Sequence, residues 1–345
     1  MALTPGELYF IGEEDLKTKQ KSNYFKIGIV RESEKRDSVN RLSEHQTGNP
    51  RRLFIAAQIQ TPAVEQVETT LHHIFAPYRV SGEWMQFDDA QLTQAVNRAL
   101  EIEKEMRTHV PLLTKAEELA NQESNGQTIP ASKEAEELYA EIQNNELIEA
   151  RCDELIDQYR DLITVSIEAG VDLSNVAKQQ TKAPTARFSE KLLKDKSPDL
   201  YAKYSEVITT VKGQFRVTPA QSWDGDIETI NPEFFKAATN FEELIDIDVI
   251  DEELEFLIHD VYLEIKSFRK LAQWNIEKAN TQLRVLTGTN DAIEGICTWK
   301  RTSSSKTVLD KDSLKLNHPE EYEACKVAVA SSKSLILEPM AGYES

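Results

Sequence analysis

The hydrophobic pattern of this 345-residue chain changes at Asp88, and the change limits what the chain can fold into. Before it, short apolar runs at residues 7–11, 24–30 and 53–59 predict strands separated by polar segments. After it, long charged stretches carry apolar residues at helical spacing. The sequence therefore predicts an α+β fold, in which a small antiparallel three-stranded sheet with flanking helices is followed by a mostly helical region.

Two helices are expected beside these strands. Residues 34–46 are polar with a helical tendency, and a Gly-Asn-Pro turn follows at residues 48–50. A Thr-Pro pair at 61–62 is a favourable helix start, and apolar residues then recur at a 3.6-residue period as far as Phe75. Residues 80–87 are expected to form an extended edge segment.

The remainder of the chain is predicted to contain long helices and an internal duplication. Helices are expected at residues 89–121, 132–169 and 252–286, with a polar linker between the first two. A helix-plus-short-strand module recurs at an offset of 121 residues, with Leu193, Lys194, Pro198 and Tyr201 matching Leu314, Lys315, Pro319 and Tyr322. We therefore expect four units, at residues 1–88, 89–131, 132–220 and 221–345.

The charge of the chain restricts its partners. The net charge is −19, which argues against a general nucleic-acid coat or a membrane-surface binder. The first 88 residues hold 11 basic and 12 acidic side chains, so nearly all of the negative charge follows them. The three cysteines lack paired spacing, and no apolar run approaches the ~20 residues of a membrane span. These features predict a cytoplasmic protein without membrane contact.

Five short motifs follow one another in the first 88 residues. They read ELYFIG with Tyr9, FKIG with Lys26, RLSEHQTG with Arg41 and His45, VETTLHHIF with Glu68 and His72, and GEWMQF at the end. Together they resemble the GIY-YIG nuclease superfamily, closest to a phage-type branch whose second motif reads KIG. The resemblance covers about a quarter of the chain, and it implies a DNA endonuclease that uses Mg²⁺ or Mn²⁺.

The resemblance also implies a role for each motif residue. Tyr9 would hold or deprotonate the attacking water, and Arg41 would contact the scissile phosphate with its planar, permanently charged fork. Glu68 would hold the metal ion, because Mg²⁺ can be bound by one carboxylate together with waters and phosphate oxygens. His45 and His72 would shuttle protons or bind phosphate.

Lys26 departs from the family pattern, since many members have a second tyrosine at this position. It could be the general base if its pKa is depressed, or a phosphate clamp if it is not. Tyr24 lies two residues earlier on the same strand face and could partly replace the missing tyrosine. Gly28 and Gly48 are expected to serve backbone geometry. Basic residues around these motifs are the expected nucleic-acid contacts: Lys21, Lys35, Arg36, Arg51 and Arg52.

Three functions compete at this point. The leading one is a metal-dependent DNA endonuclease whose C-terminal region positions DNA or binds a protein partner. The alternatives are a non-catalytic DNA-binding module and a protein-interaction module, each of phage or mobile-element origin. Residues 295–322 also faintly resemble the tail of YqaJ-type phage exonucleases. Within them, Trp299, Lys300 and Arg301 form either a small DNA contact or a buried tryptophan with solvated neighbours.

Overall fold

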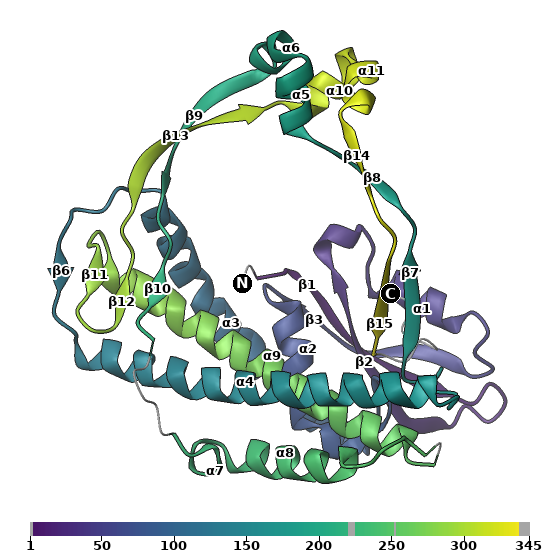
Figure 1. Cartoon of the computed structure of the whole chain (residues 1–345). Coiled ribbons are helices and arrows are strands. Elements are labelled where there is room, and N and C mark those ends of the chain that lie inside the picture. The colour runs from purple at the N-terminus through teal and green to yellow at the C-terminus, as the bar shows by residue number, and fades with distance from the viewer. Residues whose placement is uncertain (1–2, 220–224, 252, 338–345) are drawn as a thin grey trace.

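The structure is a computed structural model that describes residues 3–219, 225–251 and 253–337. Its N-terminal part is a five-stranded antiparallel sheet in the order β3-β1-β2-β5-β4 (Figure 1). The three strands expected from the apolar runs are confirmed, and the segment expected at the edge forms a short hairpin that pairs with β2. The strands are β1 (Gly6–Glu14), β2 (Lys21–Arg31), β3 (Arg52–Thr61), β4 (Arg79–Ser81) and β5 (Trp84–Gln86).

Helices cover both faces of this sheet. The helix α1 (Ser38–Gln46) begins after Asp37, whose side chain accepts a hydrogen bond from the backbone N–H of Asn40, and a short 3-10 turn (Glu32–Glu34) precedes it. The opposite face is apolar and packs against α2 (Val64–Ile74), which a second 3-10 turn (Ala76–Tyr78) follows. Because side chains alternate along a strand, β1 sends Leu8 and Phe10 into this core.

Long helices form a layer beside the sheet, and the three expected from the periodicity are confirmed. They are α3 (Asp89–Ala120), α4 (Lys133–Glu168) and α9 (Glu255–Thr287), accompanied by α7 (Ile227–Ile230) and α8 (Pro232–Ile245). Residue 252, where α9 was expected to begin, lies outside the described residues. Ala95 and Ala99 of α3 and Trp274 of α9 lie in the core under the sheet, so the N-terminal part is fixed to the helical layer. Among the described residues, no helix is long and apolar enough to cross a membrane.

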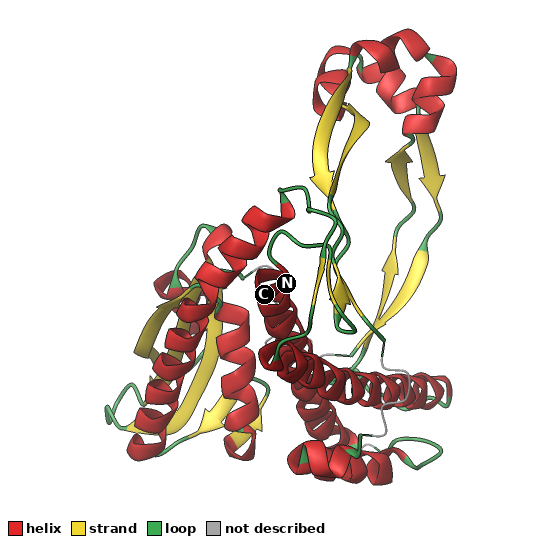
Figure 2. Cartoon of the chain, turned by 90° about the vertical axis from the view of Figure 1, so that its left-hand side faces the viewer, coloured by secondary structure: helices red, strands yellow, loops and turns green. Residues whose placement is uncertain are grey.

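An arch of two-stranded ribbons rises from the helical layer and consists of residues 178–212 and 302–336 (Figures 1 and 2). The first ribbon pairs β9 (Ser205–Lys212) with β13 (Thr302–Leu309). The second ribbon pairs β8 (Thr185–Phe188) with β14 (Lys326–Val329), and β7 (Lys178–Lys182) with β15 (Ser332–Ile336). Four short helices join the ribbons at the tip: α5 (Glu190–Lys196), α6 (Pro198–Lys203), α10 (Lys311–Asn317) and α11 (Pro319–Ala324).

The duplication seen in the sequence is visible in the arch. The first and last residues of α10 lie 121 positions after those of α5. The same offset relates α11 to α6. Leu193 and its match Leu314 are both fully buried in one core at the tip. Within the arch, each strand of residues 178–212 pairs with a strand of residues 302–336, so the two copies interlock.

The base of the first ribbon is fastened to the helical layer by a buried arginine. A four-stranded sheet lies here in the order β10 (Arg216–Val217), β12 (Cys297–Thr298), β11 (Ala292–Ile293) and β6 (Thr128–Ile129). Trp299 is buried, but Arg301 is buried as well, contrary to the solvated neighbour that the sequence suggested. Its guanidinium stacks on Trp299 and donates to the carbonyls of Gln122 and Gly288, at 3.0 and 2.7 Å.

Candidate active site

Tyr9 occupies the centre of the candidate site, on the face of β1 that α1 covers. Its side chain is buried, and its hydroxyl lies 3.5 Å from Nε2 of His45. Gly28 is its partner across the β1–β2 pair, and a Cβ on Gly28 would lie 2.5 Å from the Tyr9 hydroxyl oxygen. The expectation that Gly28 serves backbone geometry was therefore wrong, because its lack of a side chain makes room for the tyrosine. Gly48 does have the positive φ, of 82°, that favours glycine.

Arg41 and His45 reach Tyr9 from α1, where a spacing of four residues places both on one helix face. Arg41 Nη1 donates to Glu44 at 3.0 Å, whereas Arg41 Nε is buried and has no hydrogen-bond partner. Burial and the neighbouring charges of Lys26 and Arg41 lower the pKa of His45 to about 4. The imidazole is consequently neutral near pH 7. The Arg41 side chain also interacts with the Tyr9 hydroxyl, so an anionic ligand of its Nε would lie beside Tyr9.

Lys26 is buried on β2 and forms an ion pair with a residue that sequence reasoning did not single out. Its Nζ lies 3.0 Å from Oε2 of Glu83, in the turn between β4 and β5. The backbone of Glu83 also accepts a hydrogen bond from Ile27 N–H at 3.1 Å. The Lys26 amine is therefore held against the Glu83 carboxylate. Tyr24, two residues earlier, remains 40% exposed. Glu83 was present in the GEWMQF motif, although only the motif as a whole was used.

Glu68 approaches the same group of side chains from α2. Burial raises its pKa, and so does the nearby carboxylate of Glu83, while Lys270 and Arg31 lower it. Burial raises the pKa of Tyr9 above its ordinary value too, and the charges of Glu83 and Glu68 act in the same direction. Two carboxylates therefore lie within electrostatic reach of one neutral phenol. Lys270 comes from α9, some 200 residues along the chain, so no local motif could have revealed it.

The two adjacent histidines of α2 serve packing in this structure. His72 Nε2 lies 3.2 Å from the carbonyl oxygen of Ile27, and since a carbonyl can only accept, this nitrogen carries the proton. Burial lowers the pKa of His72 to about 3, so the ring is neutral. His73 instead packs edge-on against Phe268 of α9, and its Nδ1 lies 3.0 Å from Ser267 Oγ. His72 thus ties α2 to β2 beside the site, and His73 ties α2 to α9.

Most of the basic residues expected to contact nucleic acid already have partners. Arg36 contacts Glu34 and Glu44, Arg51 contacts Glu13 at 2.9 Å, and Arg52 contacts Glu14 at 2.9 Å. Lys21 lies over the ring of Phe54. Within the described residues, Lys35 has no ion pair; its backbone adopts the left-handed conformation with a φ of 55°.

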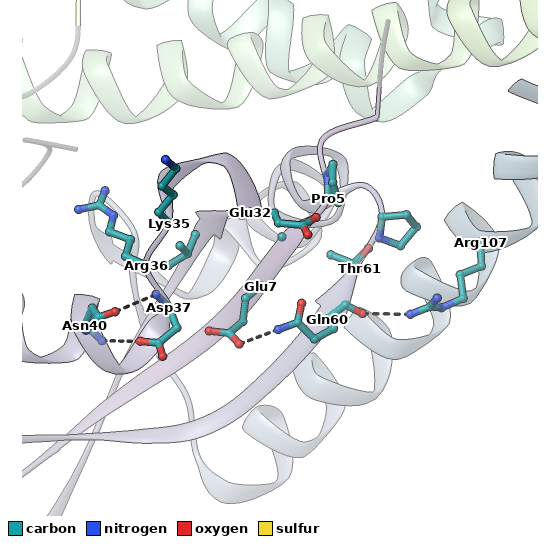
Figure 3. A pocket seen from close by; sticks show the side chains of 13 residues that line it. Pro5, Glu7, Glu32, Lys35, Arg36, Asp37, Asn40, Gln60, Thr61 and Arg107 are labelled. Atoms are coloured by element: carbon teal, nitrogen blue, oxygen red, sulfur yellow. Dashed lines mark hydrogen bonds between the residues drawn. The ribbon is translucent and has the colours of Figure 1, made fainter. Parts of the chain in front are cut away.

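A pocket of about 650 Å³ lies beside the site, two residues along β1 from Tyr9 (Figure 3). Its floor is the buried carboxylate of Glu7, which accepts hydrogen bonds from Gln60 at 2.8 Å and from the Ser38 backbone at 2.6 Å. Lys35 and Arg107 stand at its edges. The pocket thus reaches from the candidate site toward α3, with three basic and three acidic side chains in its lining.

A comparison with known protein families covers the N-terminal part of the chain. Residues 6–100 match the T5orf172 domain, a phage-associated domain related to GIY-YIG- and HNH-like nucleases. The match runs past Asp88 into α3, whose first turns pack under the sheet. No curated protein and no solved structure matches the chain.

Proposed function

We propose that the N-terminal domain is a metal-dependent DNA endonuclease of the GIY-YIG type, which hydrolyses phosphodiester bonds. One observation carries this proposal: charged and polar residues from separate motifs and separate elements lie within electrostatic range of one another around Tyr9. Arg41 and His45 reach its hydroxyl from α1, Lys26 on β2 acts on His45, and Glu68 on α2 acts on Tyr9. The likeness to a nuclease-related phage domain supports the same conclusion.

The chain's own residues can orient the reactants. In the reaction a water oxygen attacks phosphorus, one P–O ester bond breaks, and the proton lost by the water is matched by one gained by the leaving oxygen. Because burial raises the pKa of Tyr9, its phenol remains protonated and acts as a hydrogen-bond partner of the water instead of a phenolate base. The neutral His45 behind it can accept a proton through this hydroxyl. Arg41 would offer its unpaired Nε to a phosphate oxygen.

Glu68 is the residue that would hold a metal ion. The described part of the chain contains no cluster of three or more His, Cys, Asp or Glu side chains arranged as a metal site. A single carboxylate such as that of Glu68 suits Mg²⁺ or Mn²⁺, which would take waters and phosphate oxygens as its other ligands. A bound cation would neutralise charge on the phosphate. The carboxylates of Glu68 and Glu83 repel each other, and a cation bound at Glu68 would relieve this repulsion.

The second candidate is a non-catalytic DNA-binding module of phage or mobile-element origin. The observation that favours it is Lys26, which is ion-paired where the resembling family has a tyrosine. A module of this kind would retain the fold and the phosphate contact of Arg41 but would not cut.

Nicking of supercoiled plasmid separates the two candidates. The protein is incubated with Mg²⁺, with Mn²⁺ and with EDTA, beside Glu68→Gln and the matched control Glu65→Gln. Glu65 lies on the same helix and pairs with Arg31 at 2.6 Å. An endonuclease nicks only with metal, loses at least about 10³-fold in rate in Glu68→Gln, and keeps its rate in Glu65→Gln. Plasmid that is bound but never nicked would establish the binding module.

A further inference from the structure

The arch holds positive charge in a strongly acidic protein. Its six strands contain seven basic residues and one acidic residue, although the whole chain has a net charge of −19. The four tip helices contain six basic and seven acidic residues, so the positive charge belongs to the ribbons and not to the tip. The basic residues of the strands are Lys178, Lys182, Arg187, Lys212, Lys306, Lys326 and Lys333.

These side chains are exposed and mostly unpaired. Lys326 is half-buried and forms an ion pair with Glu323 at the foot of the tip helices. The other six are exposed, and none of them forms an ion pair within the described residues. Six like charges held on one scaffold without counter-ions repel one another, which an extended polyanion would relieve.

The ribbons otherwise present hydroxyls and amides. Successive residues are exposed along both faces of β7, β8 and most of β13, so neither face is buried in a core. Three large exposed apolar side chains lie among them, Val207 on β9 at 72% exposure and the smaller exposed surfaces of Val327 and Val329 on β14, and none of them is aromatic. Hydroxyl and amide groups donate to phosphate oxygens, whereas stable protein interfaces are centred on buried apolar and aromatic anchors. The surface therefore favours nucleic acid over a protein partner.

The shape of the ribbons suits duplex DNA. The first ribbon has eight residue pairs, which span about 26 Å at roughly 3.3 Å per residue. A two-stranded ribbon fits the major groove, about 12 Å wide. An isolated two-stranded ribbon is only marginally stable, but both ends of this one are held, by the tip core and by Arg301 at the base.

We propose that the two ribbons of the arch bind duplex DNA through its phosphates and supply most of the affinity of the protein for DNA. The inference rests on the proposed function for its choice of DNA as the polyanion. It assigns substrate capture to a region about 100 residues or more distant in sequence from the candidate active site.

Binding in EDTA tests the inference without any cleavage. Fluorescence anisotropy of a 30-base-pair duplex is measured over a range of salt concentrations for the full chain. The arch variant carries Lys→Gln at 178, 182, 212 and 306. Its control carries Lys→Gln at 104, 115, 133 and 236, four exposed positions on α3, α4 and α8. Circular dichroism melts show whether both variants are folded.

Six phosphate contacts predict a slope of log K against log salt of about −5, and the arch variant should show about −2. The control variant should bind like the wild type. Unchanged affinity in the arch variant, or an equal loss in the control, would overturn the proposal, and unchanged affinity would leave the ribbons as a protein-docking surface. Tighter binding to single-stranded than to duplex DNA would also overturn it. Nicking by the Glu68→Gln variant is measured in a separate assay. A negative result for DNA binding by the arch therefore leaves the proposed nuclease activity to be tested by that assay.

Discussion

The N-terminal domain and the arch use their basic side chains in opposite ways. In the N-terminal domain, Arg36, Arg51 and Arg52 each contact a carboxylate, and Lys26 is held by Glu83. In the arch, six exposed basic side chains have no ion pair within the described residues. Paired charges fix side chains in position at little gain in affinity, whereas unpaired charges attract a polyanion. The comparison suggests that the domain is built to orient a phosphate and the arch to hold DNA.

The largest effect should come from Arg41, whose buried Nε has no hydrogen-bond partner and whose side chain interacts with Tyr9. Arg41→Ala should reduce single-turnover nicking by about 10³-fold, because it removes a fixed donor to the reacting phosphate. Arg41→Lys should restore only a small part, since a lysine lacks the planar fork. Affinity for duplex DNA in EDTA should change less than threefold in both. A comparable loss of affinity would show that the domain, and not the arch, captures DNA.

The ion pair between buried Lys26 and half-buried Glu83 should give the next largest effect. Lys26→Met leaves Glu83 next to Glu68 without its cation, and the free energy of unfolding should fall by about 2–4 kcal/mol. Adding Glu83→Gln should recover most of this loss, because the double variant buries no uncompensated charge. Urea unfolding of the two single variants and the double variant measures the coupling. Additive losses would mean that Lys26 does not serve to hold Glu83.

Gly28→Ala probes how tightly Tyr9 is packed. The new Cβ would lie 2.5–2.8 Å from atoms of the tyrosine side chain, so the free energy of unfolding should fall by about 1–3 kcal/mol. The nicking rate should fall by more than the loss of folded protein accounts for, because the new methyl group displaces the Tyr9 hydroxyl. Gly48→Ala is the control, because its Cβ meets nothing within 4 Å and the cost is only that of a φ of 82°. Equal nicking in the two variants would separate Tyr9 from the reaction.

The elements of the fold were predictable where the signal was local. The three main strands, the three long helices and the offset of 121 residues follow from periodicity and repetition. The pairing of strands between the two copies did not follow, because it joins residues about 100 positions apart, as between β9 and β13. The arch as a whole was invisible for the same reason.

The candidate site was predictable only as a set of motif residues. Tyr9, Arg41 and Glu68 were identified from their motifs. The electrostatic interactions that shift the pKa values of Tyr9 and Glu68, however, depend on how α1 and α2 pack on the sheet. Lys270 was missed because α9 brings it from a distant part of the chain. The net charge of −18 after residue 88 also concealed the basic ribbons, since a regional sum averages acidic helices with basic strands.

The smallest effect tests the comparison most directly. Arg51 and Arg52 were expected to contact nucleic acid, yet each already contacts a carboxylate at 2.9 Å. Changing both to Gln should alter the affinity for duplex DNA by less than threefold. Each arginine is already neutralised by a carboxylate, so its removal takes away little attraction to phosphate. The salt slope should stay within about 0.5 of the wild type, whereas two lost phosphate contacts would reduce it by about 1.8. A reduction of that size would place DNA across the N-terminal domain and reverse the division of labour between the two regions.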